Sequence, residues 1–397
     1  MERSSACSAG RSWCPSAPTA THAAASSRAG PNPRSDVTSL DLVRRRLVGF
    51  AQQEARGVSP LYEHLAAHAA EDDEVAGLLT VAPERFAHPT LLLAAAHRLV
   101  QAEPFHRLSD YYPSLGGTYG ADERTWPLFR EFVLERADRM RELISRRSVQ
   151  TNEVRRATLL YPALAMVKGP VGLLEVGCSA GLLLGIDQYG YRYQTQQAGQ
   201  LVGGPAKAAL GLHCALELAP GAELPKVPKS VKVAAKVGLD RAPADLADED
   251  TYAWLEACVW ADQPERLRLF GVAAAVQRKS PPELVAGDAV ADLAAAAGRV
   301  PADLPLVVMT SNVLPYLPGR EFVAALRDLG RPVWWLSHEG YAAGLVHVLP
   351  DREDLRPGPG ESAFGVVGLV RFEDGAVRSA RALARTAPHG QRLVWLP

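Results

Sequence analysis

The chain has 397 residues, 47% of them hydrophobic, and its 43 basic and 44 acidic side chains give a formal net charge of −1 at pH 7. A chain of this length buries a large core and is expected to hold more than one structural unit. Because there is no overall basic charge, neither nucleic acid nor an anionic membrane is expected as a partner. The apolar stretches are only strand-sized, so no membrane-spanning helix is predicted.

The five cysteines are scattered along the chain and include no C-x-x-C pair. This pattern argues against a disulfide framework. His213 and His389 lack partners at the spacing of metal ligands, so no metal site is predicted. We interpret Cys178 and Cys258 as buried thiols and expect a soluble, cytoplasmic protein.

Residues 1–36 are rich in Ser, Ala, Pro, Arg and Gly and contain almost no large apolar side chains. They are predicted to form a disordered tail, because such a segment cannot bury enough apolar surface to fold. They lack the continuous apolar stretch of a secretory signal. The Arg- and Ser-rich, acid-poor composition also resembles an organellar transit peptide, which is the alternative interpretation.

Residues 37–168 show helical periodicity. Apolar side chains recur at helical spacing, and segments containing Gly and Pro separate the periodic stretches. The clearest stretches are 40–50, 61–66, 91–100 and 129–134. The sequence therefore predicts an all-helical N-terminal region.

From residue 169 to 397, short apolar runs alternate with helical stretches. Such alternation predicts an α/β domain with a mostly parallel sheet and helices on both faces. The predicted strands are 171–176, 191–194, 231–237, 283–286, 304–310, 333–337, 364–372 and 391–396, and the predicted helices are 181–189, 250–277, 289–298 and 319–329. No helical stretch separates the last two strands, which are therefore expected to close the sheet as an antiparallel pair.

The most informative segment is Glu175-Val-Gly-Cys-Ser-Ala-Gly181, between the first predicted strand and a helical stretch. A strand–turn–helix junction places backbone N–H groups where a ligand can bind. The segment is not the dinucleotide fingerprint G-x-G-x-x-G, because Ser179 and Leu182 stand where the second and third glycines belong.

The same segment satisfies the nucleophile-elbow pattern G-x-S-x-G, with Ser179 as the nucleophile and Asp288 and His389 as downstream partners. That motif normally follows several strands of the sheet, whereas this turn follows the first predicted strand. No oxyanion-loop motif precedes it either. A serine hydrolase is therefore the third of our three hypotheses.

The pattern acid-x-Gly-x-Gly/Ser-x-Gly of the S-adenosylmethionine loop is filled by Glu175, Gly177, Ser179 and Gly181. Small residues let the backbone approach the cofactor, and the acid can reach its ammonium group. In this fold an acid at the end of the second strand holds the ribose diol. The segment 191–197, where we expect that acid, contains no carboxylate.

Asp288 follows the predicted strand 283–286 and fits two roles, a contact to the adenine amino group or a cap of the helix that begins at residue 289. Asn152 and Glu153, where the helical region joins the sheet, are expected either to line the cleft or to cap the next helix. Tyr316 and the pair His338-Glu339 follow or end the later strands, where open α/β sheets bind ligands.

His338 or Tyr316 is our candidate catalytic base, and Glu339 is a candidate catalytic carboxylate beside His338. His338 and Glu339 are neighbours on a strand and point to opposite faces, so they need not touch.

Further motifs accompany these residues: Arg56-Gly-Val-Ser-Pro-Leu-Tyr62, Tyr112-Pro-Ser-Leu-Gly116, Gln150-Thr-Asn-Glu-Val154, Gly238-Leu-Asp240, Trp254-Leu-Glu-Ala257, Gly287-Asp-Ala289, Trp334-Trp-Leu-Ser-His-Glu-Gly340 and Ala387-Pro-His-Gly390. With them, the chain from about residue 40 onward resembles a largely actinobacterial family of uncharacterised proteins, domain of unknown function 2332. The resemblance implies a class I methyltransferase-like (Rossmann-like) domain behind a helical region, and it brings no established activity, cofactor or catalytic residue. Members often have Ala where this chain has Cys178.

The resulting hypothesis is an S-adenosylmethionine-dependent methyltransferase that acts on a small molecule by in-line displacement, with the helical region over the cleft. The runner-up is a non-catalytic protein of the same fold that binds a nucleotide-like ligand or a protein partner. The missing acid after the second predicted strand motivates this alternative.

Overall fold

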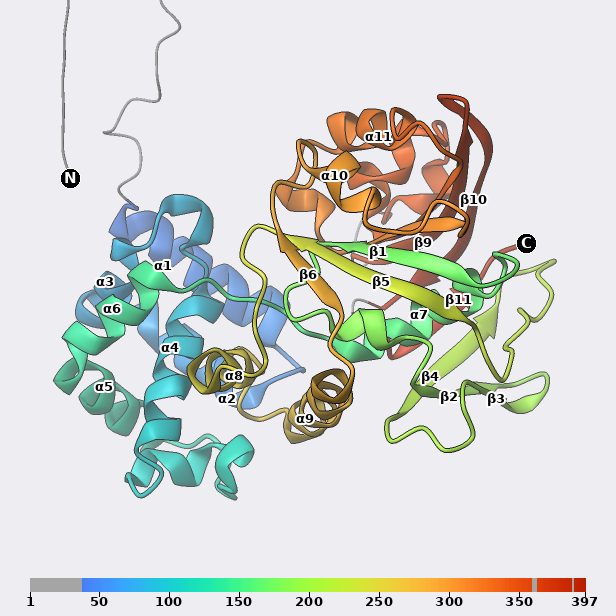
Figure 1. Ribbon diagram of the computed structural model, residues 1–397. Coiled ribbons are helices and arrows are strands. Elements are labelled where there is room, and N and C mark those ends of the chain that lie inside the picture. Colours follow the sequence, from blue (N-terminus) through green and yellow to red (C-terminus); the bar gives the residue numbers. More distant parts are fainter. Residues whose placement is uncertain (1–37, 359–362, 388) are drawn as a thin grey trace, which may run out of the picture.

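The computed structural model describes residues 38–358, 363–387 and 389–397, so the predicted disordered tail, residues 1–36, lies outside the described residues. A helical region, formed by the first part of the described chain, stands beside an eleven-stranded sheet (Figure 1). Among the helices of the described part, none combines the length and the apolar character that a bilayer crossing requires.

The N-terminal helices begin at residues that satisfy their first free N–H groups. The side chains of Ser39, Ser59 and Asp72 each accept a hydrogen bond from a backbone N–H in the following turn. Pro60 and Pro89 stand at the start of their helices, where no N–H is needed. The helices of this region are α1 (Leu40–Gly49), α2 (Pro60–Ala69), α3 (Asp73–Gly77), α4 (Pro89–Ala102), α5 (Thr125–Glu135) and α6 (Ala137–Arg146).

The second part of the chain forms one mixed sheet. Its strands are β1 (Val171–Val176), β2 (Gly190–Thr195), β3 (Gly199–Gly203), β4 (Gly211–Leu218), β5 (Val233–Asp240), β6 (Glu283–Ala286), β7 (Leu306–Ser311), β8 (Val333–Glu339), β9 (Gly365–Glu373), β10 (Ala376–Thr386) and β11 (Arg392–Trp395). They lie in the order β3-β2-β4-β11-β10-β9-β8-β7-β1-β5-β6. Six of the ten pairings in the described chain are parallel, which confirms the prediction of an α/β fold with a mostly parallel sheet.

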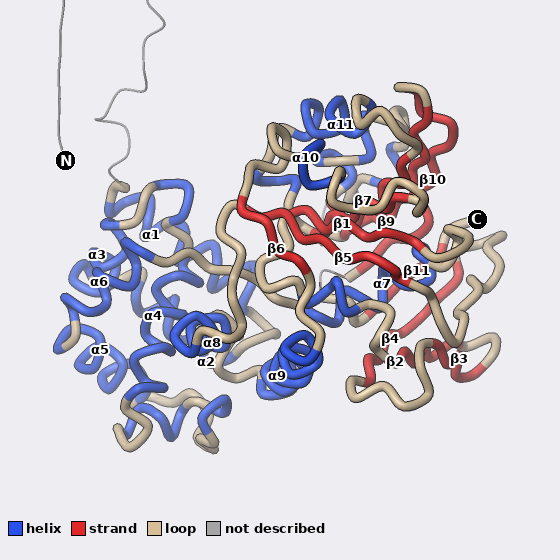
Figure 2. The backbone as a smooth tube through the Cα atoms, viewed as in Figure 1, coloured by secondary structure: helices blue, strands red, loops and turns tan. Residues whose placement is uncertain are grey.

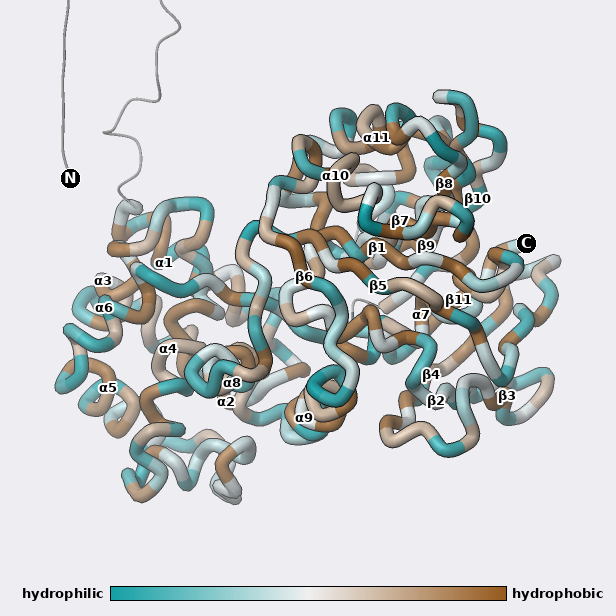
Figure 3. Tube along the Cα trace, in the orientation of Figure 1, coloured by the Kyte–Doolittle hydropathy of each residue, from teal (hydrophilic) through white to brown (hydrophobic). Residues whose placement is uncertain are grey.

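Helices cover both faces of this sheet (Figure 2). Successive side chains of a strand point to opposite faces, so Leu173 packs into one core and Leu174 into the other. Residues of the first core come from the N-terminal helices, α7 (Ala157–Leu164), α8 (Glu249–Ala257) and α9 (Pro264–Lys279). The second core includes α10 (Leu293–Ala297) and α11 (Gly319–Arg327). Both faces of β1 are therefore buried, and the central strands are largely apolar (Figure 3).

The strands β3, β4 and β10 were not predicted from the sequence. The first half of β10 is mostly exposed and carries Arg and Ser, so no apolar run marks it. The C-terminal strands pair in antiparallel fashion, but β10 lies between the two runs that were expected to pair, because β9 and β11 each pair with β10.

Two helix predictions also differ from the structure. The helix expected over 181–189 is only a short 3₁₀ turn, Leu182–Gly185, because the chain enters β2 at residue 190. The helix expected over 250–277 is divided into α8 and α9.

The strand that follows β1 along the chain is not its neighbour in the sheet. The chain leaves β1, forms β2, β3 and β4 at the far end of the sheet, and returns to place β5 directly against β1. The prediction that the segment 191–197 ends the second strand of the cofactor-binding sheet is therefore wrong.

Candidate functional site

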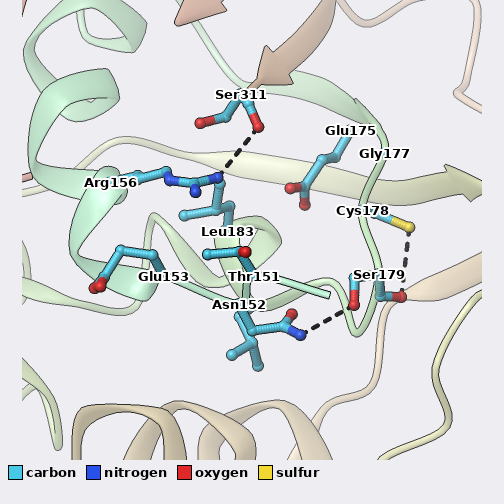
Figure 4. A pocket seen from close by; sticks show the side chains of 11 residues that line it. Thr151, Asn152, Glu153, Arg156, Glu175, Gly177, Cys178, Ser179, Leu183 and Ser311 are labelled. Carbon is cyan, nitrogen blue, oxygen red and sulfur yellow. Dashed lines mark hydrogen bonds between the residues drawn. The ribbon is translucent and has the colours of Figure 1, made fainter. Parts of the chain in front are cut away.

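The order of the strands reverses at β1. β5 and β6 lie on one side of it, whereas β7 and β8 lie on the other, and all five strands run parallel. Ligands of open α/β sheets bind outside the carboxyl ends of the strands at such a reversal. A cavity of about 30 Å³ lies at this position, lined by the turn after β1, by residues 151–156 and by the end of β7 (Figure 4).

The turn after β1 places three alternate residues at positive φ: Gly177 at 75°, Ser179 at 50° and Gly181 at 67°. Gly177 has no room for a side chain, because a Cβ there would lie 2.4 Å from Val313 Cγ2. The left-handed conformation costs a non-glycine residue about 1 kcal/mol. At Ser179 this cost is offset by a hydrogen bond from its backbone N–H to Asp240 Oδ2 at 2.8 Å.

Glu175 lies at the end of β1 and faces the cavity (Figure 4). Its side chain is buried, and its Oε2 has no hydrogen-bond partner among the described residues. Burial and the nearby Asp240 raise the pKa of this carboxyl well above its usual range, while Arg156 opposes the shift. Buried polar atoms are nearly always paired in proteins, so a free carboxyl oxygen at a cavity points to a ligand that donates a hydrogen bond.

Asp240 is an acid at this edge of the sheet that the sequence analysis did not single out. It ends β5, the strand beside β1, and its Oδ1 also accepts a hydrogen bond from the Ala242 N–H at 2.9 Å. Counting β2 as the second strand caused the error, since the insertion of β2 to β4 separates β1 from β5 along the chain. The motif Gly238-Leu-Asp240, just after the predicted strand 231–237, was the available signal.

Asp288 caps the segment after β6. Its Oδ1 accepts hydrogen bonds from the N–H groups of Val290 at 2.9 Å and Ala291 at 3.1 Å. Its Oδ2 accepts a third from Arg241 Nη2 at 2.9 Å. These hydrogen bonds lower the pKa of Asp288 to about 2. The capping role is thus visible in the structure, whereas a contact to adenine stays a prediction.

Residues 148–152, which we call the strap, cross over the turn after β1 as they lead from the helical region to the sheet. Asn152 Nδ2 donates to Ser179 Oγ at 3.1 Å, and Ser179 Oγ in turn donates to Gln150 Oε1. Gln150 Nε2 donates to the Ala242 carbonyl at 3.2 Å. Trp254 Nε1 of α8 donates to the Ser148 carbonyl at 3.0 Å. The strap is thereby tied to the turn and to the segment after β5.

These contacts argue against Ser179 as a nucleophile. Both side-chain partners of its hydroxyl are amides, which do not accept a proton at neutral pH. Asp288 is paired with Arg241 instead, and burial together with Arg266, Arg156 and Arg155 lowers the pKa of His389 to about 3. Asp288 is thus engaged elsewhere, and no hydrogen bond joins His389 to Ser179 among the described residues.

Arg156 forms the wall of the cavity opposite Glu175 (Figure 4). Its side chain is buried; Nη1 donates to the Ser311 carbonyl at 3.3 Å, and Nε has no hydrogen-bond partner among the described residues. Glu153, three residues earlier, pairs with Arg266 at 2.6 Å and accepts a hydrogen bond from the Arg155 N–H. Glu153 therefore lines the cavity and also caps the short turn before α7.

His338 is fully buried and contacts the cavity only through Ser311. Its Nδ1 lies 3.0 Å from Ser311 Oγ, and its Nε2 lies 3.0 Å from Thr386 Oγ1. Burial, with Arg156 and His389 nearby, lowers the pKa of His338 to about 3. The imidazole is thus neutral at physiological pH. Its hydrogen bond with Thr386 holds the ring, and its hydrogen bond with Ser311 orients that hydroxyl at the edge of the cavity.

Glu339 and Tyr316 do not reach the cavity. Glu339 accepts hydrogen bonds from the N–H groups of Val313 at 3.2 Å and Leu314 at 3.3 Å. Burial raises its pKa to about 8. Tyr316 follows β7, and 77% of its surface is exposed. The structure therefore brings Glu175, Gly177 and Ser179 together at the cavity, with Gly181 in the same turn, but neither Glu339 nor Tyr316.

Sequence reasoning missed Arg156 and Ser311 as well as Asp240. The signal for Arg156 was its position directly before the apolar stretch 157–165, and that for Ser311 was the polar end of β7. Within residues 38–358, 363–387 and 389–397, no group of three or more His, Cys, Asp or Glu side chains is placed to hold a metal ion.

Comparison with known proteins identifies one family. Residues 44–395 match the family described as uncharacterised proteins conserved in bacteria, domain of unknown function 2332. No curated protein and no solved structure matches the chain significantly. The match spans nearly the whole sequence, and the chain belongs to the domain-of-unknown-function family 2332.

Proposed function

We propose that the protein binds S-adenosylmethionine at the carboxyl ends of β1 and β5 and transfers its methyl group to a small molecule. The observation that carries this proposal is the pair of acids Glu175 and Asp240, which end neighbouring strands on either side of a small-residue turn. The cofactor has two groups that acids can bind, an ammonium group and a ribose diol.

The topology supports the same assignment. Numbered along the chain, the five parallel strands β6-β5-β1-β7-β8 have the order 3-2-1-4-5, which is also that of dinucleotide-binding sheets. In such sheets an acid after the second strand binds the ribose, and Asp240 stands at that position. The Asp240 carboxylate already accepts N–H hydrogen bonds and offers further lone pairs to a diol.

The chemistry proposed for the site is displacement at the methyl carbon. S-adenosylmethionine, held by Glu175 and Asp240, would supply an activated methyl group. The acceptor's electron pair would form the new bond while the carbon–sulfur bond breaks, S-adenosylhomocysteine would leave, and the acceptor's proton would pass to solvent. Catalysis of such a step depends mainly on positioning the two reactants. We propose Ser311 as the residue that orients the acceptor, since His338 fixes its hydroxyl; a pKa near 3 makes His338 itself a weak base at neutral pH.

Isothermal titration calorimetry with S-adenosylmethionine and S-adenosylhomocysteine tests the proposal. We expect saturable binding by the wild type and a loss of at least about tenfold in affinity in Asp240→Asn and Glu175→Ala, since each removes one charge-assisted contact. Asp303→Asn, an exposed acid away from the site, is the control and should bind normally. No binding by the wild type at millimolar ligand would exclude the function, and undiminished binding by both variants would exclude the site.

The alternative is a protein of the same fold that binds such a ligand without catalysis. The observation that favours it is that no histidine lines the cavity among the described residues, since His338 reaches it only through Ser311. Both proposals use the same ligand site. Production of S-adenosylhomocysteine in the presence of candidate acceptors separates them, because only a methyltransferase forms it.

A further inference from the structure

Two buried ionisable groups, one basic and one acidic, face each other across the cavity without pairing. Arg156 is 7% exposed and Glu175 is 4% exposed, and both line the cavity (Figure 4). Their nitrogen and oxygen atoms are not within the 4.0 Å of an ion pair, and Arg156 Nε and Glu175 Oε2 have no hydrogen-bond partners among the described residues. The gap between them is open to a ligand.

Glu153 and Glu339 lie near Arg156 and favour its charged form, but neither forms an ion pair with it. Glu153 pairs with Arg266, and Glu339 accepts hydrogen bonds from two backbone N–H groups. The only hydrogen bond of the Arg156 guanidinium within the described chain is the one to the Ser311 carbonyl. A buried cation without a paired anion is costly, by several kcal/mol in general. An anion that enters the cavity would relieve this cost, and bidentate carboxylate binding is the geometry that arginine prefers.

Glu175 requires a cationic ligand group, whereas Arg156 requires an anionic one. Its free oxygen faces the same space, so a ligand that brings a cation close to it would allow the carboxyl to ionise and to form a charge-assisted hydrogen bond. A ligand that pairs with both Arg156 and Glu175 must carry an anion and a cation a few ångströms apart. The α-amino acid group has this arrangement, with its carboxylate and ammonium group on one carbon.

We infer that Arg156 and Glu175 form a clamp for an α-amino acid group, in which the guanidinium binds the carboxylate and Glu175 binds the ammonium group. This inference rests on the proposed function for the identity of the rest of the ligand, since S-adenosylmethionine ends in such a group. The clamp itself would also accept a free amino acid. The cavity of about 30 Å³ has room for about two water molecules, so the residues that cover it move outward when the ligand enters.

The test compares three ligands by isothermal titration calorimetry. S-adenosylhomocysteine carries both the amino acid group and the adenosine, methylthioadenosine carries only the adenosine, and L-methionine carries only the amino acid. We expect the wild type to bind S-adenosylhomocysteine at least about a hundredfold more tightly than methylthioadenosine, because two charge-assisted contacts contribute about tenfold each. Arg156→Gln and Glu175→Gln should reduce this preference and leave methylthioadenosine binding nearly unchanged.

The controls separate a clamp from a structural role. Arg192→Gln removes an exposed arginine on β2 and should keep the wild-type preference. Arg156→Lys keeps the charge without the planar fork and should retain part of the preference. If Arg156→Gln fails to fold, Arg156→Lys takes its place in the test. Thermal unfolding followed by circular dichroism shows whether each variant is folded.

The outcomes distinguish the clamp from the proposed function. If both adenosine ligands bind but the Arg156 and Glu175 variants weaken them equally, the clamp is wrong and cofactor binding stands. If L-methionine alone binds, and binding depends on Arg156, the clamp stands and the proposed function is wrong. If none of the three ligands binds to the folded wild type, both are wrong.

Discussion

At the scale of single residues, burial shifts the pKa values of three ionisable groups at or next to the site toward their neutral forms. The pKa of Glu175 is raised, that of Glu339 is raised to about 8, and that of His338 is lowered to about 3, each chiefly by burial. Arg156, Asp240 and the ion pair of Glu153 with Arg266 lie at the same edge of the sheet.

Glu339 gives a prediction about stability and pH. The folded state keeps this proton up to a pKa of about 8, whereas the unfolded chain loses it near the usual 4.5. Unfolding thus releases a proton between these values, so the contribution of Glu339 to stability falls as the pH rises through that window. Glu339→Gln removes this effect. Between about pH 5.5 and 7, the slope of the free energy of unfolding against pH should therefore be less negative in the variant than in the wild type, by about 1.4 kcal/mol per pH unit.

Urea denaturation at several pH values measures this difference. Glu123→Gln, an exposed carboxyl, is the control and should keep the wild-type slope. Equal slopes in Glu339→Gln and the wild type would mean that Glu339 is ionised in the folded protein.

At the scale of elements, the strap joins the helical region to the sheet and covers the turn that we assign to the cofactor. Gln150 reaches both Ser179 and the Ala242 carbonyl, close to Asp240. An adenosyl group whose ribose binds Asp240 would compete with the Gln150 side chain for this space. The strap is therefore expected to loosen when the cofactor binds.

Gln150→Ala tests the competition. Because the ligand no longer displaces the Gln150 side chain and its hydrogen bonds, the affinity for S-adenosylhomocysteine should rise about fivefold, equivalent to about 1 kcal/mol. Calorimetry measures the affinity, and hydrogen exchange of residues 148–152 should increase in the wild type on ligand binding. Gln200→Ala, on the exposed edge strand β3, is the control. A weaker affinity in Gln150→Ala would instead make Gln150 a ligand contact.

The elements predicted correctly from the sequence are those that a local run of apolar residues marks. β1 has the predicted bounds because a buried parallel strand is a continuous apolar run. β6 also has the predicted bounds, although it is an edge strand with exposed ends. β10 was missed because half of it is exposed, and α8 and α9 were merged because the break between them is short. Glu175 was found from its motif, whereas Asp240 required the knowledge that β5 pairs with β1. Local periodicity does not reveal such a long-range strand pairing.

At the scale of the whole molecule, the helical region and the sheet share one core. The core cluster on one face of the sheet runs without interruption from the N-terminal helices through α8 and α9 to the central strands. Polar contacts reinforce this junction: Asp262 accepts hydrogen bonds from the Ser59 hydroxyl at 2.7 Å and from the Leu61 N–H at 3.1 Å. The helical region is thus expected to unfold together with the sheet.

Asp262→Ala tests this cohesion. It removes a charged acceptor from the buried Ser59 hydroxyl and from the first turn of α2, so the free energy of unfolding should fall by about 2–3 kcal/mol. The transition should remain single, because the core is continuous. Urea denaturation followed by both circular dichroism and tryptophan fluorescence measures both properties. Asp303→Ala is the exposed control, and two separate transitions in the wild type would contradict a shared core.

The central claim is that an adenosyl cofactor binds where β1 and β5 end. A crystal structure of the protein with S-adenosylhomocysteine tests it most directly. We predict density with the ribose hydroxyls within hydrogen-bond distance of Asp240, the ammonium group at Glu175 and the carboxylate at Arg156. Density for the ligand at another place on the protein, or an empty site in crystals grown at millimolar S-adenosylhomocysteine, would contradict the claim.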